Sequence, residues 1–552
     1  MKTLLFFALL PLSLVTFGQN KDYSVVKTRK FIEPFVKTEL VASVEDQKGG
    51  IYTIRYYDEY VSMKHHHSNS VGFIVQHWDS LQQSQSYNNY KIETDKKGII
   101  AGFTIAEEKL HVLEYEKNKR DKTIDCFLHK PIDYTNELKR EKIFSIDIKR
   151  FPNFIIPELS NNLDSNYYGN MEFSENGKYI AFHIDSYSKD TEAHKIFVFN
   201  GDFKMVWEKE FTHNEKDRLF DIHQVKVDNH GDVYILGKVY HNKRQNVVKK
   251  KVNYHYEVFK VTENKTEHTY LNLLDRFAHT MSLVIKDNQV NCIGIYSEKS
   301  DLNVIEFFAG KDQFAISGTL FFSINKDNMK IINTLFQKFS PEFLTNKYDV
   351  NGDKENGGYI IKKIKTLKDG GCLLIAEEFH VQTKSYSYFT PNGFSVNSIN
   401  VGSVSQESKS YVTLNYNDIV VLRLDKLGNL VWSKNINKHH IGSSFSDKLV
   451  SCSTLVHNED SYIFLNERKN VMPVDNNLNF QINKFGNINK KNSNLYMVKL
   501  DGSGNISCDA LHLNRYNDIM FYPVNGQSVY NSQMVIFGSN EKQKQFLTFK
   551  LN

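Results

Sequence analysis

Two kinds of segment alternate along the chain, and both predict β-strands. The first kind is a short turn followed by seven to nine mostly apolar residues. The turn DGG at 369–371 precedes CLLIAEEF, and the turn NHG at 229–231 precedes DVYILGKVY. Runs that mix β-branched, aromatic and small residues between turns are typical of largely buried strands. An aromatic content of 13% supports this interpretation, because aromatic rings suit a pleated, half-buried surface.

The second kind of segment is a pair of strands around a tight turn. IFVFNGDFKMVWEKEF begins at Ile196 and VVLRLDKLGNLVWSKNI begins at Val420. In both, a polar turn residue precedes a tryptophan by seven positions: Asn200 precedes Trp207, and Asp425 precedes Trp432. The same spacing in YMVKLDGSGNISCDALH ends on a cysteine instead. A recurring internal spacing indicates a repeat architecture.

Eight copies of the first segment alternate with eight of the second. The first segments start near 51, 98, 179, 232, 290, 371, 461 and 533. The shortest spacing matches a four-stranded propeller blade of roughly 40 to 50 residues, and the longer spacings contain polar insertions. The sequence therefore predicts an all-β chain with a single β-propeller of eight blades, with seven as the alternative. The first segment would be the second strand of each blade, and the second segment its third and fourth strands.

The two ends of the chain are expected to close the ring together. The last segment, FLTFKLN from Phe546, supplies only a third strand, and a bare sheet edge invites pairing with other chains. YSVVKTRKF at 23–31 is a half-polar strand that could cover this edge. The propeller domain would then span residues 19–552.

Short motifs resemble those of known exported propellers. MEFSENGKYIAF from Met171 is similar to the repeat of TolB-like propellers. KTLKDGGCLLIAEE and LRLDKLGNLVWSK resemble segments of quinoprotein-like propellers. The resemblance implies an exported bacterial β-propeller. These families include scaffolds, ligand-binding proteins and enzymes, so the fold alone does not choose the function.

The first 18 residues have the features of a secretory signal peptide. Lys2 is followed by an apolar run from Leu4 to Val15 and by the small-x-small pattern TFG, which ends at Gly18. No later run approaches the roughly 18 apolar residues of a membrane helix, so we expect no transmembrane segment. The mature chain is expected in the periplasm or at the outer membrane, with the cell surface or extracellular medium as alternatives.

The charge balance argues against a nucleic-acid partner, and the cysteine content bears on disulfide bonding. Lys and Arg total 69 against 64 Asp and Glu, and a nucleic-acid surface would need a basic face that this balance does not supply. The five cysteines leave at least one thiol unpaired within the chain. Cys292 and Cys372 lie within apolar strand patterns, where cysteine acts as a small buried hydrophobe.

Long polar insertions are expected on one face of the ring. They fall between the second and third strands of four blades, at about 241–254, 298–318, 379–418 and 468–494. Such long loops in a compact domain are usually functional or disordered. Seven of the eight second strands also end in a carboxylate: Asp58, Glu107, Asp185, Glu298, Glu377, Glu467 and Glu541. If the register holds, these acids ring the central mouth and favour a cation or a basic partner; alternatively, they are ordinary polar strand ends beside neutralising lysines.

Catalytic motifs are absent. The chain contains no GxSxG, HExxH, P-loop or GxGxxG. The adjacent His439 and His440 would point to opposite sides of an extended segment, so we expect a surface loop there and assign neither a metal nor a cofactor. The sequence favours a non-enzymatic scaffold or accessory subunit that binds protein partners in a cell-envelope or secretion complex, peripheral to the outer membrane. There are two alternatives. The first is a propeller that uses the central mouth, either as a hydrolase or lyase or to bind carbohydrate. The second is a lectin-like surface protein.

Overall fold

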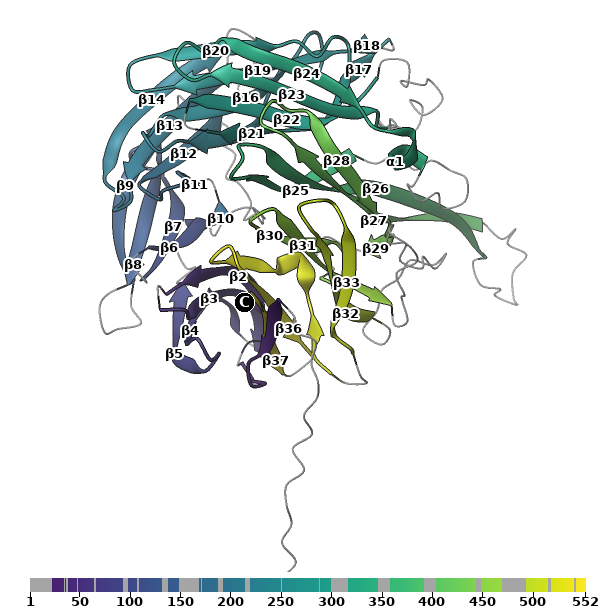
Figure 1. Cartoon of the computed structure of the whole chain (residues 1–552). Helices are drawn as coiled ribbons and strands as arrows, with labels where there is room; N and C mark the ends of the chain where they lie inside the picture. Colours follow the sequence, from purple (N-terminus) through teal and green to yellow (C-terminus); the bar gives the residue numbers. More distant parts are fainter. Residues whose placement is uncertain are drawn as a thin grey trace, which may run out of the picture.

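Figure 1 shows a computed structural model of the chain. The structure describes residues 22–33, 35, 38–46, 48–63, 66–92, 98–106, 109–131, 138–147, 168–169, 171–186, 192–213, 219–249, 251–286, 288–298, 316–345, 358–391, 404–442, 448–468, 493–514, 518–540 and 543–552.

The described strands form an eight-bladed β-propeller of antiparallel sheets, as the repeat pattern predicts. Blade 1 contains β2 (Thr38–Glu45), β3 (Ile51–Met63), β4 (His66–Trp78) and β5 (Ser84–Ile92). Blade 2 contains β6 (Gly98–Ala106), β7 (Lys109–Asn118), β8 (Thr123–Pro131) and β9 (Leu138–Asp147), with β10 (Tyr168–Gly169) against β6. Blade 3 contains β11 (Met171–Phe173), β12 (Tyr179–Ser186), β13 (Glu192–Asn200) and β14 (Met205–His213). Blade 4 contains β15 (Phe220–Val227), β16 (Val233–Tyr240), β19 (Tyr254–Val261) and β20 (Thr266–Leu271), with the small hairpin β17 (Val247–Val248) and β18 (Lys251–Val252) between β16 and β19.

The second half of the ring follows the same plan. Blade 5 contains β21 (Phe277–Ile285), β22 (Gln289–Ser297), β23 (Gly318–Asn325) and β24 (Ile331–Lys338), and α1 (Pro341–Thr345) follows it. Blade 6 contains β25 (Gly358–Thr366), β26 (Cys372–Pro391), β27 (Val404–Leu424) and β28 (Leu430–Ile436), with β29 (His440–Gly442) also paired to β27. Blade 7 contains β30 (Cys452–His457), β31 (Asp460–Arg468), β32 (Ser493–Leu500) and β33 (Ile506–His512). Blade 8 contains β34 (Met520–Phe521), the 3₁₀ turn η4 (Pro523–Asn525), β35 (Gln527–Val529), β36 (Gln533–Ser539) and β37 (Lys544–Leu551).

The two ends of the chain close the ring, as predicted. β1 (Tyr23–Lys27) pairs antiparallel with β37, from Tyr23 opposite Leu551 to Lys27 opposite Leu547. Phe31 adds a bridge to Lys544. The purple N-terminal and yellow C-terminal strands therefore lie together in Figure 1. The outer strand of blade 8 comes from the start of the chain, which leaves β37 without a bare edge.

Blade 2 differs from the sequence prediction in its strand order. In most blades the register shifts between the first and second strands or between the third and fourth. In blade 2 the shifts lie between β6 and β7 and between β8 and β9, whereas β7 and β8 pair without one. The segment at Gly98 is therefore the first strand of its blade, and the second strand begins at Lys109. The turn signal before Gly98 precedes a first strand here, which explains the difference.

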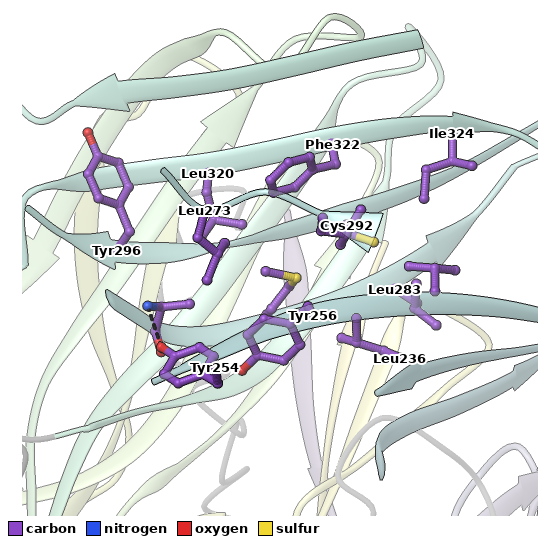
Figure 2. Close-up of a cluster of buried hydrophobic side chains, with 14 of the residues drawn as sticks. Leu236, Tyr254, Tyr256, Leu273, Leu283, Cys292, Tyr296, Leu320, Phe322 and Ile324 are labelled. Carbon is purple, nitrogen blue, oxygen red and sulfur yellow. Dashed lines mark hydrogen bonds between the residues drawn. The ribbon is translucent and has the colours of Figure 1, made fainter. Parts of the chain in front are cut away.

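Apolar side chains fill the spaces between blades. The described core separates into eight clusters of buried residues, and each lies between two neighbouring sheets. Figure 2 shows the cluster between blades 4 and 5, where Leu236 and Tyr256 face Leu283, Cys292 and other residues of blade 5. Cys292 and Cys372 are both buried, as predicted, and all five cysteines are free thiols. Eight inter-blade clusters in a ring of eight blades mean that every blade is held by two neighbours.

The tight turns explain the Asp-to-Trp spacing in the sequence. Asp425 Oδ1 accepts hydrogen bonds from the backbone N–H groups of Leu427 and Asn429, which closes the turn. Seven residues after Asp425, Trp432 donates from Nε1 to the carbonyl of Gly502 in blade 7 at 2.9 Å. The spacing therefore places the indole against the corresponding turn of the next blade.

Candidate functional site

Blade 6 carries a two-stranded ribbon that extends beyond its sheet (Figure 1). β26 and β27 are 20 and 21 residues long, against seven to nine for the other two strands of blade 6. Their register continues from Phe379 opposite Tyr416 to Pro391 opposite Val404. At about 3.4 Å per residue, this part spans roughly 40 Å. We call residues 379–391 and 404–416 the ribbon. It lies within the predicted insertion at 379–418, and these described residues form a paired extension rather than a loop, while 392–403 lie outside the described residues.

A β-bulge marks the base of the ribbon. The register of β26 against β27 shifts between Glu377, opposite Ile419, and Phe379, opposite Tyr416. Asn417 and Asp418 therefore lie opposite the single residue Glu378. Bulges of this kind bend the strand and often lie beside functional sites.

Glu377 is the centre of a buried polar cluster at this bulge. Its carboxylate lies 2.7 Å from Lys438 Nζ and 3.4 Å from Lys362 Nζ, and it accepts a hydrogen bond from Ser451 Oγ. Lys362 also donates to Ser451 Oγ at 3.0 Å. All four residues are less than 5% exposed. The cluster joins β25, β26 and the segment after β28 to the start of blade 7.

A second part of the cluster holds blade 7 through His440. The backbone N–H of Ser451 donates to His440 Nδ1 at 3.1 Å, so Nδ1 is the unprotonated nitrogen. His440 Nε2 then donates to Glu467 Oε1 at 2.9 Å. His439 contacts Asn417 instead, with 2.7 Å between Nδ1 and Oδ1. We call the following residues the base network: Lys362, Glu377, Asn417, Asp418, Lys438, His439, His440, Ser451 and Glu467.

The prediction that His439 and His440 lie in a surface loop is wrong. His440 is completely buried, because β29 pairs with β27 and draws this segment into the fold. The two imidazoles do have different partners, as their adjacent positions require.

The opposite charges in the base network keep Glu377 ionised and Lys362 protonated. Although burial alone would raise the pKa of Glu377, Lys438 and Lys362 lower it to about 2. Burial alone would lower the pKa of Lys362, but Glu377 raises it above its usual value. Lys362 therefore stays protonated and cannot take a proton from Ser451. Since Ser451 is also completely buried, the pair does not have the properties of an accessible serine nucleophile.

The predicted acid ring is only partly within the described side chains. Glu377 and Glu467 are buried and have internal partners, and Glu298 lies 3.4 Å from Arg276 Nε. The structure gives only the backbone positions of Asp58 and Asp185. Asp185 is next to the last residue of β12, whereas Asp58 lies inside β3, which continues to Met63, so the predicted strand end at Asp58 is wrong. Glu107 and Glu541 lie outside the described residues. Whether the seven acids act together at the mouth stays a prediction.

Sequence reasoning missed the basic and hydroxyl members of the base network. Lys362, Lys438 and Ser451 belong to three separate segments, and no linear spacing relates them to Glu377. Only the run of polar residues at 435–440, NINKHH, deviates from the expected strand pattern. Within the described part of the chain, no group of three or more His, Cys, Asp or Glu side chains could hold a metal ion. No described helix is long and apolar enough to cross a membrane.

Comparisons with known proteins assign no family to the chain. No family model matches the chain, and no curated protein matches it. Among solved structures, the β-propeller domain of the Trilobed protease from Pyrococcus furiosus is 9% identical, with 88% of this chain and 98% of that chain covered and a TM-score of 0.32. The polysaccharide lyase Uly1 is 11% identical, with 95% and 91% covered and a TM-score of 0.37. Prolyl oligopeptidase B from Galerina marginata is 7% identical, with 91% and 54% covered and a TM-score of 0.37.

Proposed function

We propose that this chain is an exported, non-enzymatic propeller that binds a protein partner in the cell envelope, as a scaffold or an accessory subunit. The ribbon of blade 6 is the observation that carries the proposal. It extends roughly 40 Å beyond the sheet from which it arises, and the ring closes without it, because β1 pairs with β37. A paired extension of this length that the fold does not need is suited to contact with another molecule.

The base of the ribbon supports a binding role. Glu377, Lys362 and Lys438 fix β26 and the segment after β28 to one another, and His440 ties the same segment to blade 7. A buried network with satisfied partners rigidifies its surroundings. A ribbon held in one direction loses less conformational freedom when it binds, which favours affinity. As part of the same proposal, we place the chain among exported propellers similar to the TolB-like and quinoprotein-like families.

Shortening the ribbon tests the proposal without disturbing the ring. Residues 382–413 are replaced by Asn-Gly, which joins Val381 to Leu414, a pair that already face each other across the two strands. Asn-Gly is the preferred two-residue hairpin connection. The matched control shortens the extended hairpin of blade 1: Asn-Gly replaces residues 58–71 and joins Tyr57 to Gly72, which also pair.

The wild-type chain and each variant would be expressed in the native host. All three would carry photo-crosslinking residues at the same positions, on the face of the propeller from which the ribbon extends. We expect both variants to melt within about 3 °C of the wild-type chain. The ribbon variant should lose a stoichiometric crosslinked partner that the wild-type chain and the blade 1 variant retain. No stoichiometric partner for the wild-type chain, or equal capture by all three, would contradict the proposal.

A further inference from the structure

We propose that the partner supplies an extended strand that pairs with the outer edge of β27, along residues 404–412. This inference rests on the proposed function and names how the ribbon would bind. In β-strand addition, main-chain hydrogen bonds from a free sheet edge supply the affinity, and alternate side chains supply the specificity.

Among the described strands, those that cover the outer edge of β27 do so only near the base of the ribbon. β28 pairs with β27 from Ile419 to Leu424. β29 pairs with it from Leu414 to Tyr416. Beyond this point, β26 is the single described strand that pairs with residues 404–412. The backbone N–H and C=O groups on the outer edge of residues 404–412 therefore continue outward from the base of the ribbon, where β26, β27 and β29 already form three paired strands.

β29 shows that this edge can accept a third strand. His440, Ile441 and Gly442 pair antiparallel with Tyr416, Asn415 and Leu414. This short strand is separated from β28 by residues 437–439, which lie beside the bulge at Asn417 and Asp418. A partner strand in line with β29 would continue pairing that the chain itself begins, so its first hydrogen bonds would form beside an ordered neighbour.

The edge has few of the features that usually prevent such pairing. Natural sheet edges are blunted by lysines, prolines and bulges. Residues 404–412 read VSQESKSYV, with one glutamate, one lysine and no proline. The outer strand of blade 2 offers a contrast, because β9 reads LKREKIFSID and has five charged residues in ten. The edge of β27 is therefore less charged than that of β9, and it resembles outer strands such as β5, SQSYNNYKI, which has one charged residue in nine.

The composition favours a peptide segment over a second copy of the chain as the occupant. Stable homodimers bury broad apolar interfaces, whereas the nine residues 404–412 are mainly serine and other polar residues with two valines and a tyrosine. Such an edge offers main-chain hydrogen bonds along a narrow strip. An extended segment with few charges and alternating β-branched or aromatic residues would match it.

The probe is a library of phage-displayed 12-residue peptides, selected on the full-length mature chain. Two adjacent prolines, Ser408→Pro and Lys409→Pro, are tested against Ser408→Ala and Lys409→Ala. Backbone N–H groups alternate in direction along a strand, so one of the two positions directs its N–H towards β26 and the other directs it outward. Amide hydrogen exchange on the wild-type chain identifies the outward position by its faster exchange. The outward proline removes a donor from the free edge while the bonds to β26 stay intact.

We expect ribbon-dependent peptides whose affinity falls at least tenfold with the outward proline and less than twofold with either alanine. An unchanged melting temperature for the outward variant would show that the ribbon is intact. Failure to select peptides that depend on the ribbon, or equal effects of proline and alanine at the outward position, would overturn the inference. A concentration-dependent dimer that the outward proline abolishes would also overturn it, since the occupant would then be a second copy. If the crosslinked partner depends on the ribbon but is insensitive to the outward proline, β-strand addition fails and the proposed function stands.

Discussion

Glu33 should be the most sensitive single residue for closure of the ring. Its side chain is completely buried between Arg55 of blade 1 and Lys544 of blade 8, and the carboxylate lies 2.8 Å from Lys544 Nζ. Thr38 Oγ1 donates to the same carboxylate at 2.9 Å. We call these four residues the closure cluster. It joins the segment after β1 to the last strand of the chain and to the first complete blade.

The charges in the closure cluster are unequal, and this sets the expected magnitude. One carboxylate balances two buried cations. At an effective dielectric constant of about 20, the attraction across 2.8 Å is about 6 kcal/mol before the cost of removing the charges from water. Glu33→Gln leaves Arg55 and Lys544 without a counter-ion, and breaking a buried pair in this way costs about 3 to 5 kcal/mol. Lys544→Met leaves the balanced pair of Glu33 and Arg55, so it should cost much less.

Urea unfolding at pH 7 and calorimetry would measure these differences, and amide hydrogen exchange would locate them. We expect Glu33→Gln to lose protection first in β1 and β37. Lys30→Met is the control, because Lys30 is 42% exposed and its pair with Asp518 is partly in solvent; the control should cost less than about 1 kcal/mol. The reasoning is refuted if Glu33→Gln costs less than about 1 kcal/mol, or if Lys544→Met costs as much.

The same substitution should alter the acid response. Although burial alone would raise the pKa of Glu33, Arg55 and Lys544 lower it below its usual value. A carboxyl group with a lowered pKa in the folded state stabilises the fold above its unfolded pKa, and this stability is lost as the pH falls through the folded pKa. The wild-type chain should therefore lose the contribution of Glu33 below about pH 4.5. Glu33→Gln should lack this part of the acid transition.

Two further predictions concern a turn and a pair of histidines. Gly428→Ala should cost about 2 to 4 kcal/mol, because φ is +90° and the new Cβ would lie 2.3 Å from the Phe321 ring; Gly177→Ala, at φ +69° with open space around it, should cost only about 1 kcal/mol in the same urea titration, and equal costs would exclude the steric explanation. His183 lies 3.1 Å from His194, and burial lowers the pKa of His183 to about 4; because the unfolded state then binds the proton more readily, stability should fall as the pH drops from 6.5 towards 4, by about 2 kcal/mol at pH 5. Thermal melts should show a weaker pH dependence in His183→Gln, and an unchanged dependence would contradict this assignment.

The blade repeat was predictable because each blade encodes its own local signals. Turns such as the one at Asp425 need a side chain that accepts backbone hydrogen bonds and a glycine at positive φ, here Gly428, so their spacing is visible in one sequence. The first strand of blade 2 was misassigned for the same reason, since the turn signal before Gly98 resembles those before second strands. Ring closure was also predictable, because a last blade with a missing strand requires a partner from elsewhere.

The candidate site was less predictable because its residues meet only through the ring. The insertion at 379–418 was visible as surplus length, but long-range register, rather than composition, makes it a paired ribbon. Lys362 and Glu377 lie on neighbouring strands, while Lys438 and Ser451 come from the connection to blade 7. Complementary charges across such distances leave no pattern in a single sequence.

The closure cluster and the base network solve the same physical problem at two places where regular blade packing is interrupted. At the closure, a strand from the start of the chain replaces the outer strand of blade 8; at the ribbon, a bulge separates β28 from β29. Apolar packing is not directional, so it would hold these segments in several orientations. A buried carboxylate between two lysines or between a lysine and an arginine requires one geometry, because an unpaired buried charge costs several kcal/mol. The base of the ribbon is therefore joined to blade 7 by the same kind of interaction that joins the two ends of the ring.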